Sequence, residues 1–280
     1  MGYPDKMNLI RVIAEIAGTP CYRKSPMASI RYLYARWIFR RFRIGDPFEF
    51  LAKMGIDPQA AMQGFDRWRE ILEAAQTRIE RGSGEQGGIG WKDGVILFGL
   101  ARAIQPEYVV ETGVAAGMST SFLGAALIEN GCGRLYSIEL PVTATDELSL
   151  SDGSHYTWQE RGVGWAVPES IRSELAGRHT LVLRDVREAL PEVLSQIPHV
   201  DLFFHDDLHT PGHMLWEYER VWRKLRPGGV LLSDDVNYGW LQFCEREKIR
   251  GTSLNNVDRL CALRRPFALA TAKPAMGEKQ

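Results

Sequence analysis

Several features that would assign this chain to a specialised class are missing from its sequence. No apolar run reaches the roughly 20 residues that an α-helix needs to cross a bilayer. The first residues lack the cationic start, long apolar segment and cleavage site that together mark a secretory signal. The four cysteines are scattered and form no Cys-x-x-Cys pair, so zinc-finger and redox spacings are absent. We therefore expect neither signal nor anchor, cysteines that are small buried apolar residues, and a cytoplasmic location.

A strong overall charge is also absent. The net charge of the 280 residues is -1, which gives no global attraction to nucleic acid or to any other polyanion. Hydrophobic residues make up 45% of the chain and charged residues 25%, as in an ordinary soluble globular protein. We expect no nucleic-acid partner, and any basic surface has to be local.

Residues 22–43 are the one local departure from this charge balance. The segment has no acid, and its apolar residues recur at helical spacing. It is consistent with a helix lying on an anionic surface, such as a membrane. We favour instead a helix whose basic face lies in solvent while its apolar stripe packs against the protein, or a helix that contacts a second copy in a homodimer. The basic residues are Arg23, Lys24, Arg31, Arg36, Arg40, Arg41 and Arg43, and the stripe is Ile30, Leu33, Tyr34, Trp37, Ile38 and Phe42.

The chain divides by pattern into a helical part and an alternating part. Residues 58–82 have the spacing of one amphipathic helix, with Phe65, Trp68 and Leu72 on its apolar side. The glycine-rich stretch 82–90 follows it, and we place a boundary there. Residues 1–86 are thus expected to form a helical N-terminal extension, and residues 87–280 the main domain.

After the boundary, short β-branched runs alternate with helical segments. This order predicts an α/β fold with a Rossmann-like, doubly wound, mostly parallel sheet. In such sheets ligands bind at the carboxyl ends of the strands. The expected strands are 107–113, 134–140, 179–185, 200–207, 228–236 and a last one at 267–273, and the expected helices are 91–104, 118–130, 169–177, 187–197 and 213–227.

Each of the first five strands is expected to end in an acid. Glu111 precedes Gly113 and Gly117, whose spacing lets the backbone turn tightly toward a ligand. An acid there would repel a pyrophosphate and suits a cationic ligand, and Gly-x-Gly-x-x-Gly is absent. Glu139 can accept both hydroxyls of a ribose, which NAD-binding folds also require. Asp185 closes the third strand, where it could meet an adenine edge, and the other two strands end in Asp206-Asp207 and Asp234-Asp235.

As an ordered set, these strand ends resemble a known family. ETGVAAGMS, the acid of LYSIEL, RDV, FFHDD and RPGGVLLSDDV lie between residues 87 and 240. They resemble class I S-adenosylmethionine (SAM)-dependent methyltransferases, and their spacing resembles the catechol and caffeoyl-CoA type and related small-molecule O-methyltransferases. The resemblance implies a methionine-end site, a ribose acid at Glu139, an adenine side and a contact from Asp206. The methionine-end residues would be Glu111, Gly113, Ala115, Gly117 and Ser119, and the adenine side would be Asp185 and Val186.

The resemblance also implies a divalent cation and a base. Asp206, Asp234 and Asp235 occupy the positions of the family's metal ligands, and hard oxygen ligands suit Mg²⁺ or another octahedral cation. The family has Asn where this chain has Asp235. His209 stands where the family places its basic lysine, and histidine can take a hydroxyl proton near neutral pH. His209 and Asp206 are therefore the expected catalytic residues.

Other residues near these motifs carry two interpretations each. His205 points away from Asp206 along its strand and is expected in the core or behind the site. His213 opens a helix and is expected at the surface, with a ligand role as the alternative. The segment 146–170 is long enough for a lid or an acceptor-binding loop. Its Tyr156, Trp158 and Trp165 could line an acceptor or form a small separate core.

Four functions remain open on the sequence alone. The leading one is SAM-dependent methyl transfer to a hydroxyl of a small molecule (a sugar, phenol or natural product), assisted by a divalent cation. A second dispenses with the metal and uses His209 as base toward an oxygen or nitrogen. The third is a NAD-dependent oxidoreductase, and the fourth a SAM-binding module without turnover. A base methyltransferase acting on nucleic acid is disfavoured, because HDDLH stands where such enzymes often carry an N/D-P-P-Y segment.

Overall fold

Parallel strands of branched and aromatic residues form the centre of the molecule. The computed structural model describes residues 25–81, 88–141, 147–149, 155–157, 162–249 and 252–267. Within them one sheet has the strand order β5-β2-β1-β6-β7-β9-β8, and neighbours from β5 to β7 run parallel. The strands are β1 (Tyr108–Thr112), β2 (Arg134–Glu139), β5 (His179–Leu183), β6 (Val200–His205), β7 (Leu225–Ser233), β8 (Asn256–Val257) and β9 (Leu260–Arg264).

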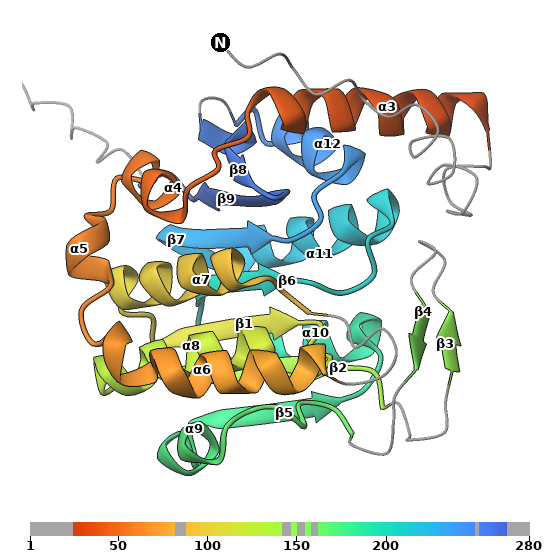
Figure 1. Cartoon of the computed structure of the whole chain (residues 1–280). Coiled ribbons are helices and arrows are strands. Elements are labelled where there is room, and N and C mark those ends of the chain that lie inside the picture. Colours follow the sequence, from red (N-terminus) through yellow and green to blue (C-terminus); the bar gives the residue numbers. More distant parts are fainter. Residues whose placement is uncertain are drawn as a thin grey trace, which may run out of the picture.

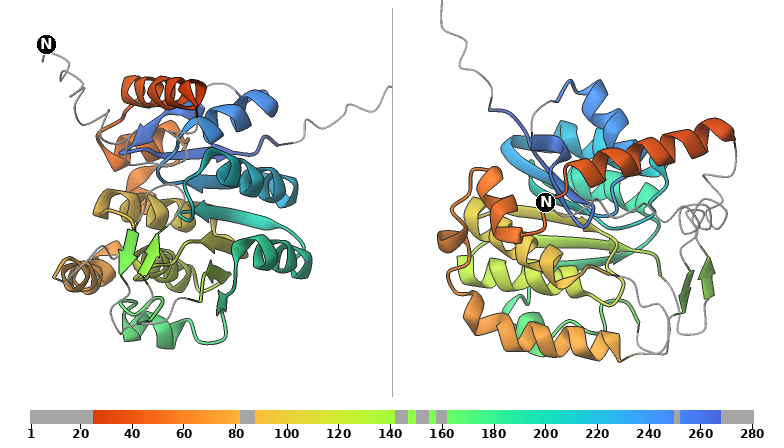
Figure 2. Two further views of the ribbon diagram at one scale, coloured as in Figure 1. Left: turned by 90° about the vertical axis from the view of Figure 1, so that its right-hand side faces the viewer. Right: turned by 45° about the horizontal axis from the view of Figure 1, so that its top comes forward.

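Helices cover both faces of this sheet, as Figures 1 and 2 show. Strand β6 is buried at all six positions, as expected for a strand between two helical layers. One hydrophobic cluster joins the sheet to α4–α9, and a second joins it to α3 and α10–α12. The fold class predicted from the sequence is confirmed. The helices are α3 (Pro26–Arg41), α4 (Pro47–Lys53), α5 (Pro58–Ala61), α6 (Phe65–Glu80), α7 (Trp91–Ile104), α8 (Met118–Asn130), α9 (Glu169–Glu174), α10 (Val186–Gln196), α11 (Pro211–Lys224) and α12 (Tyr238–Arg246).

The N-terminal helices share these two clusters with the main sheet. Trp68 and Leu72 of α6 are buried with residues of α7 and α8, and Phe39 of α3 is buried with residues of α10–α12. The boundary at residue 86 stays a prediction.

Three predicted elements are placed differently by the structure. The single helix over 58–82 is wrong, because Gly64 adopts a left-handed conformation (φ 85°) and separates α5 from α6. Strand β7 begins at Leu225, three residues before the expected start at Gly228. The sheet is completed by the antiparallel strand β9, and Phe267 lies outside any strand, while 268–273 are outside the described residues.

The long segment after β2 contains a small hairpin of β3 (Glu147–Ser149) and β4 (His155–Thr157). Trp158 is outside the described residues, and so are the side chains of β4, including that of Tyr156; Trp165 is half-buried. Of the described cysteines, Cys244 and Cys261 are buried as expected, whereas Cys132 is exposed. The exposure of Cys132 corrects the expectation that all the cysteines are buried.

Gly113, the first residue after β1, lies against the backbone of Asp206, the first residue after β6. Its φ is 83°, and a Cβ built on it would overlap the backbone carbonyl of Asp206. Any side chain there would push apart the first residues after two neighbouring strands. Only glycine fits both the conformation and the contact.

The first prediction compares Gly113→Ala with Gly131→Ala. Gly131 is also left-handed (φ 68°), but a Cβ there meets nothing within 4 Å. We expect Gly131→Ala to lower the free energy of unfolding by about 1 kcal/mol. Gly113→Ala should lower it by at least about 3 kcal/mol, because overlap adds to strain. Urea unfolding measures both, and equal losses would contradict the close approach.

Candidate active site

Backbone hydrogen bonds bring the carboxyl ends of five neighbouring strands to one edge. Each bond joins the first residues after one strand to the end of the strand beside it. Side chains that follow β5, β2, β1, β6 and β7 are thereby gathered along one line, at the right-hand ends of these strands in Figure 1. The bonds are Arg184 N to Glu139 O (2.9 Å), Gly113 N to Ile138 O (3.0 Å), Asp206 N to Thr112 O (2.8 Å) and Asp234 N to His205 O (2.9 Å).

Glu139 fixes the glycine-containing turn between β1 and α8. Its Oε2 accepts hydrogen bonds from the backbone N–H groups of Val114 (2.8 Å) and Ala115 (3.0 Å). Ala115 and Gly117 both have positive φ, 46° and 96°, so the turn is tight. In this structure the carboxylate therefore shapes the turn, and its predicted ribose contact stays a prediction.

Glu111 is a fully buried carboxylate that is only half satisfied. Its Oε2 accepts hydrogen bonds from the hydroxyls of Thr120 and Ser137, both at 2.7 Å. Its Oε1 has no hydrogen-bond partner among the described residues. Burial raises the pKa of Glu111, and the hydroxyls of Ser119, Ser137 and Thr120 oppose that rise. A cationic group beside Oε1 would remove the cost of burying this charge.

The acids after β6 and β7 destabilise one another's charged forms. Burial, followed by the charges of Asp234 and Asp235, raises the pKa of Asp206 well above its usual range. Burial and the charge of Asp235 do the same to the pKa of Asp234. Arg259 offsets part of this charge through an ion pair with Asp235 at 2.5 Å. The set is therefore suited to a cation, which would favour the ionised carboxylates.

Asp93, at the start of α7, belongs to the same acidic region and was not predicted. Its Oδ2 accepts the backbone N–H of Gly90 (3.2 Å), and its Oδ1 has no partner among the described residues. Burial, with the nearby charges of Asp258 and Asp235, raises the pKa of Asp93 to about 7. In the sequence it resembles an ordinary first-turn acid, so nothing there distinguished it from a helix cap.

His209 lies beside Asp206, as the two catalytic assignments require. The distance between its Nε2 and Asp206 Oδ1 is 3.6 Å. The His209 ring meets the ring of His205 edge-on, with centroids 5.5 Å apart. Asp206 and His209 thus form a pair at the end of β6, and their catalytic roles stay predictions.

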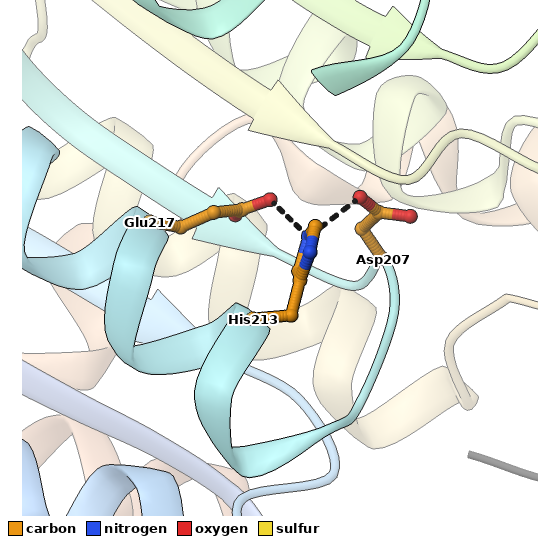
Figure 3. A group of neighbouring side chains, drawn as sticks. All are labelled: Asp207, His213 and Glu217. Atoms are coloured by element: carbon orange, nitrogen blue, oxygen red, sulfur yellow. Dashed lines mark hydrogen bonds and ion pairs between the residues drawn. The ribbon is translucent and has the colours of Figure 1, made fainter. Parts of the chain in front are cut away.

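A buried network of charged side chains lies behind this pair. Figure 3 shows His213 between the carboxylates of Asp207 and Glu217. Its Nε2 is 3.2 Å from Asp207 Oδ2 and 3.0 Å from Glu217 Oε1. The other oxygen of Glu217 accepts the hydroxyl of Thr112 and Nδ1–H of His205, both at 2.8 Å. Glu217 therefore links β1, β6 and the loop after β6 to α11.

The buried network contradicts the surface position expected for His213, and it contains Glu217, which was not predicted. His213 was expected at the surface, but only 4% of it is exposed. The core position expected for His205 is confirmed, since it is fully buried. Glu217 is fully buried as well, and sequence reasoning missed it. In the helix PGHMLWEYERVWRK it is one charged residue among several, and its partners are distant in the sequence.

Asp207, His213 and Glu217 are also the one group in the described part of the chain with three ligand atoms within 4.8 Å of one another. The distances of 3.0 and 3.2 Å are those of hydrogen bonds, and they place a proton between the groups. Burial alone would lower the pKa of His213, but Asp207 and Glu217 raise it to about 9. Burial would raise the pKa of Glu217, but His205 and His213 lower it to about 2.

The residues expected beside adenine lie at the edge of this arrangement. Asp185 is exposed and caps α10 by accepting the backbone N–H of Arg187 at 2.8 Å. Val186 is the first residue of α10 and is buried. A cavity of about 540 Å³ lies elsewhere, lined by Arg226 and Gly228 at the start of β7 and Arg264 at the end of β9. That cavity is remote from the strand-end acids.

Comparison with known proteins shows one matching family model and several distantly similar structures. Residues 110–236 match a family model described as a methyltransferase domain. No curated protein matches the chain significantly. One similar structure is the O-methyltransferase TomG from Streptomyces achromogenes, involved in tomaymycin synthesis and bound to SAM. It is 21% identical over 65% of this chain and 79% of its own, with a TM-score of 0.45.

Two further structures show similarity at the same level. An O-methyltransferase from Bacillus cereus, in complex with SAH, is 16% identical over 65% of this chain and 80% of its own (TM-score 0.45). A methyltransferase from Geobacter sulfurreducens is 17% identical over 70% and 88% (TM-score 0.46). These TM-scores are too low for the similarity to assign an activity or a substrate.

The sheet and its edge define the class of this protein. A doubly wound sheet with acids and turn glycines at its carboxyl edge belongs to the α/β proteins that bind nucleotide-like cofactors there. The family match begins in β1 and ends just after the acids that follow β7, so it includes most of the edge described above. Residues 110–236 therefore belong to a methyltransferase domain. This match favours methyl transfer over the interpretation as a NAD-dependent oxidoreductase.

Within the described ranges, no helix is both long enough and apolar enough to cross a bilayer.

The second prediction concerns pH and His213. A pKa raised to about 9 means that the stabilisation is complete below pH 6.5 and lost as pH rises through 9. We expect the free energy of unfolding to fall by about 3 kcal/mol across that window. His213→Gln should abolish this slope. The control is His179→Gln, because burial lowers the pKa of His179, so its loss cannot remove the slope. Denaturation curves at several pH values test this, and an unchanged slope in His213→Gln would contradict it.

Proposed function

We propose that this protein transfers the methyl group of SAM to a hydroxyl of a small molecule, with a divalent cation at the acids after β6 and β7. The observation that carries the proposal is the unpartnered Oε1 of the buried Glu111, at the same edge as Asp206 and Asp234. A carboxylate in that position is costly without a cationic ligand, and SAM carries both an ammonium and a sulfonium group. The resemblance to small-molecule O-methyltransferases supports the hydroxyl acceptor.

In this proposal the methionine end of SAM binds at the residues around Glu111. Ser119 contributes to the polar surroundings of Glu111, and the turn from Gly113 to Gly117 carries only the side chains of Val114, Ala115 and Ala116. Gly117 precedes α8, whose first backbone N–H groups are free of helical partners. These residues would bind and orient the donor, which supplies an electrophilic methyl group. In this proposal Glu139 contacts the ribose, and Asp185 and Val186 the adenine side.

The chemistry of Asp206, Asp234 and Asp235 fits a hard cation such as Mg²⁺. Carboxylate oxygens are its usual ligands, and the raised pKa values of Asp206 and Asp234 reflect repulsion that a cation would remove. The three carboxylates are not among the groups whose ligand atoms lie within 4.8 Å of one another in the described residues. We propose that they hold the cation together with water. When bound, the cation would lower the proton affinity of the acceptor hydroxyl.

The acceptor loses one proton as the methyl group arrives, and His209 is the proposed base. Its Nε2 is 3.6 Å from Asp206 Oδ1, so the resulting imidazolium would face a carboxylate. The overall balance is a new carbon–oxygen bond, a broken carbon–sulfur bond, and S-adenosylhomocysteine as the second product. The metal-free alternative assigns the whole task to His209 and Asp206. A module without turnover would bind SAM and release no S-adenosylhomocysteine.

The third prediction tests the donor site with Glu111→Gln. The change keeps the shape of the side chain and removes the charge that would face the cation. We expect SAM affinity to fall at least about 30-fold, since losing one partner of a buried charge pair costs about 2 kcal/mol or more. Calorimetric titration of the full chain with SAM measures this.

Glu107→Gln is the matched control for this titration. Glu107 immediately precedes the same strand at its opposite end, and it is exposed. Its substitution should leave the dissociation constant unchanged. Tight SAM binding by Glu111→Gln would reject the proposed role of Glu111, whereas no SAM binding by the wild type would reject the proposed function.

The fourth prediction locates the cation with Mn²⁺ as a paramagnetic probe. We expect wild type to bind Mn²⁺, and Asp206→Asn and Asp234→Asn to weaken binding at least about tenfold, because each removes a charged ligand. Glu217→Gln should weaken binding far less than either Asp variant, which distinguishes this site from the Asp207–His213–Glu217 group. Electron paramagnetic resonance of free Mn²⁺ measures the affinities.

The same variants separate the proposed mechanism from its metal-free alternative. With a panel of catechols and sugars as acceptors, chelator should abolish S-adenosylhomocysteine release if the cation is required. If release persists with chelator and is lost in His209→Gln, the metal-free mechanism holds. Mn²⁺ binding that depends on Glu217 and not on Asp206 would reject the proposed metal ligands.

A further inference from the structure

The outward face of α3 is apolar, which is the reverse of what the sequence predicts. Tyr32, Ala35 and Phe39 are the buried residues of this helix. Met27, Ile30, Tyr34 and Trp37 are each more than half exposed, and Phe42 just beyond the helix is 38% exposed. The expected packing of that stripe against the protein is therefore wrong for Ile30, Tyr34, Trp37 and Phe42, whereas Leu33 and Ile38 are half-buried. Spacings of three and four residues place Met27, Ile30, Tyr34 and Trp37 on one side of the helix.

The helix is firmly attached through its opposite side. Phe39 is buried in the hydrophobic cluster of α10–α12, and its carbonyl accepts a hydrogen bond from the Asn256 side chain at 2.8 Å. Arg43 forms an ion pair with Asp258, and the Ile44 N–H donates to the Asn256 carbonyl at 2.7 Å. In Figure 1 the helix lies along the top of the molecule, beside α12 and β8. The exposed stripe is thus held rigidly and faces away from the core.

The charged side chains of α3 itself all have one sign. No acid occurs between residues 22 and 45 of the sequence, while basic residues recur through the helix. Arg41 lies over the ring of Trp37 at 6.0 Å, and Arg31 over the ring of Tyr238 at 5.1 Å. Arg31, Arg40 and Arg41 are exposed. A surface that combines exposed Trp, Tyr and Ile with arginines suits an apolar layer covered by anions.

We propose that α3 is a docking surface for a membrane that contains anionic lipid, with the helix lying in the plane of the interface. Its 16 residues span about 24 Å, which allows contact along the whole stripe. Trp37, Tyr34 and Ile30 enter the boundary between headgroups and acyl chains, while the arginines contact lipid phosphates. A second copy of the chain fits less well, because pairing two such helices would place arginines against arginines. This inference is independent of the proposed catalytic function.

The fifth prediction uses the full chain and sedimentation with vesicles. Vesicles of phosphatidylcholine are compared with vesicles in which one third of the lipid is phosphatidylglycerol. We expect binding to the anionic vesicles only, and release when salt is raised to about 1 M, where screening acts within about 3 Å. Ile30→Ser with Trp37→Ser should weaken binding at least about tenfold. Arg41→Gln should weaken it about fivefold.

The matched control removes one exposed apolar residue and one exposed cation from other surfaces. Leu181 on β5 is 39% exposed and Arg223 on α11 is exposed, so Leu181→Ser with Arg223→Gln makes an equivalent change away from α3. It should bind vesicles like wild type. Thermal unfolding of every variant shows that losses of binding do not come from losses of fold.

Three results would overturn the proposal. The first is no binding to anionic vesicles, which would also be the result if another segment of this chain covers the stripe. The second is equal binding to neutral and anionic vesicles, which would remove the role of the arginines. The third is a dimer in sedimentation velocity that Ile30→Ser with Trp37→Ser converts to monomer without any vesicle binding. That outcome would make the stripe a contact between two copies.

Discussion

The close approach of Gly113 to the backbone of Asp206 is the contact on which the site depends. It brings the ends of β1 and β6 together, and the adjoining backbone hydrogen bonds extend that line from β5 to β7. The first residues after these strands consequently lie along one edge of the sheet. Because many side chains at this edge are acids, the fold accumulates negative charge where burial is expensive. A cationic donor and a metal ion are the ligands that such an edge favours, which connects the backbone geometry to methyl transfer.

The buried network under this edge gives it a rigid base. Glu217 reaches from α11 to Thr112 on β1 and His205 on β6, and it shares His213 with Asp207. A fully buried carboxylate is stable there because three polar side chains hydrogen-bond to it. Asp207 directly follows Asp206, so the network also restricts the loop that carries the proposed metal ligand and His209. The buried network and the acids at the edge thus differ: the carboxylates of the network face histidines, and we propose that those at the edge face ligands.

Sequence periodicity was sufficient for the five parallel strands, the layers and the position of the ligand edge, because alternating β-branched runs and helices allow few arrangements. It located Glu111, Glu139, Asp206 and Asp234 at strand ends, but it could not show that Glu139 bonds the turn or that Glu111 is half satisfied. It missed Glu217 and Asp93, whose burial depends on partners far away in the sequence. It also misjudged α3, since periodicity reveals that residues share a face and not which face the rest of the protein covers.

The most direct test of the central claim is a crystal structure of the protein soaked with SAM. The account predicts the donor at the carboxyl edge, with its ammonium group at hydrogen-bond distance from Glu111 Oε1 and its sulfonium on the side of Asp206. Binding in the cavity between Arg226 and Arg264, or at any place without contact to Glu111, would contradict it.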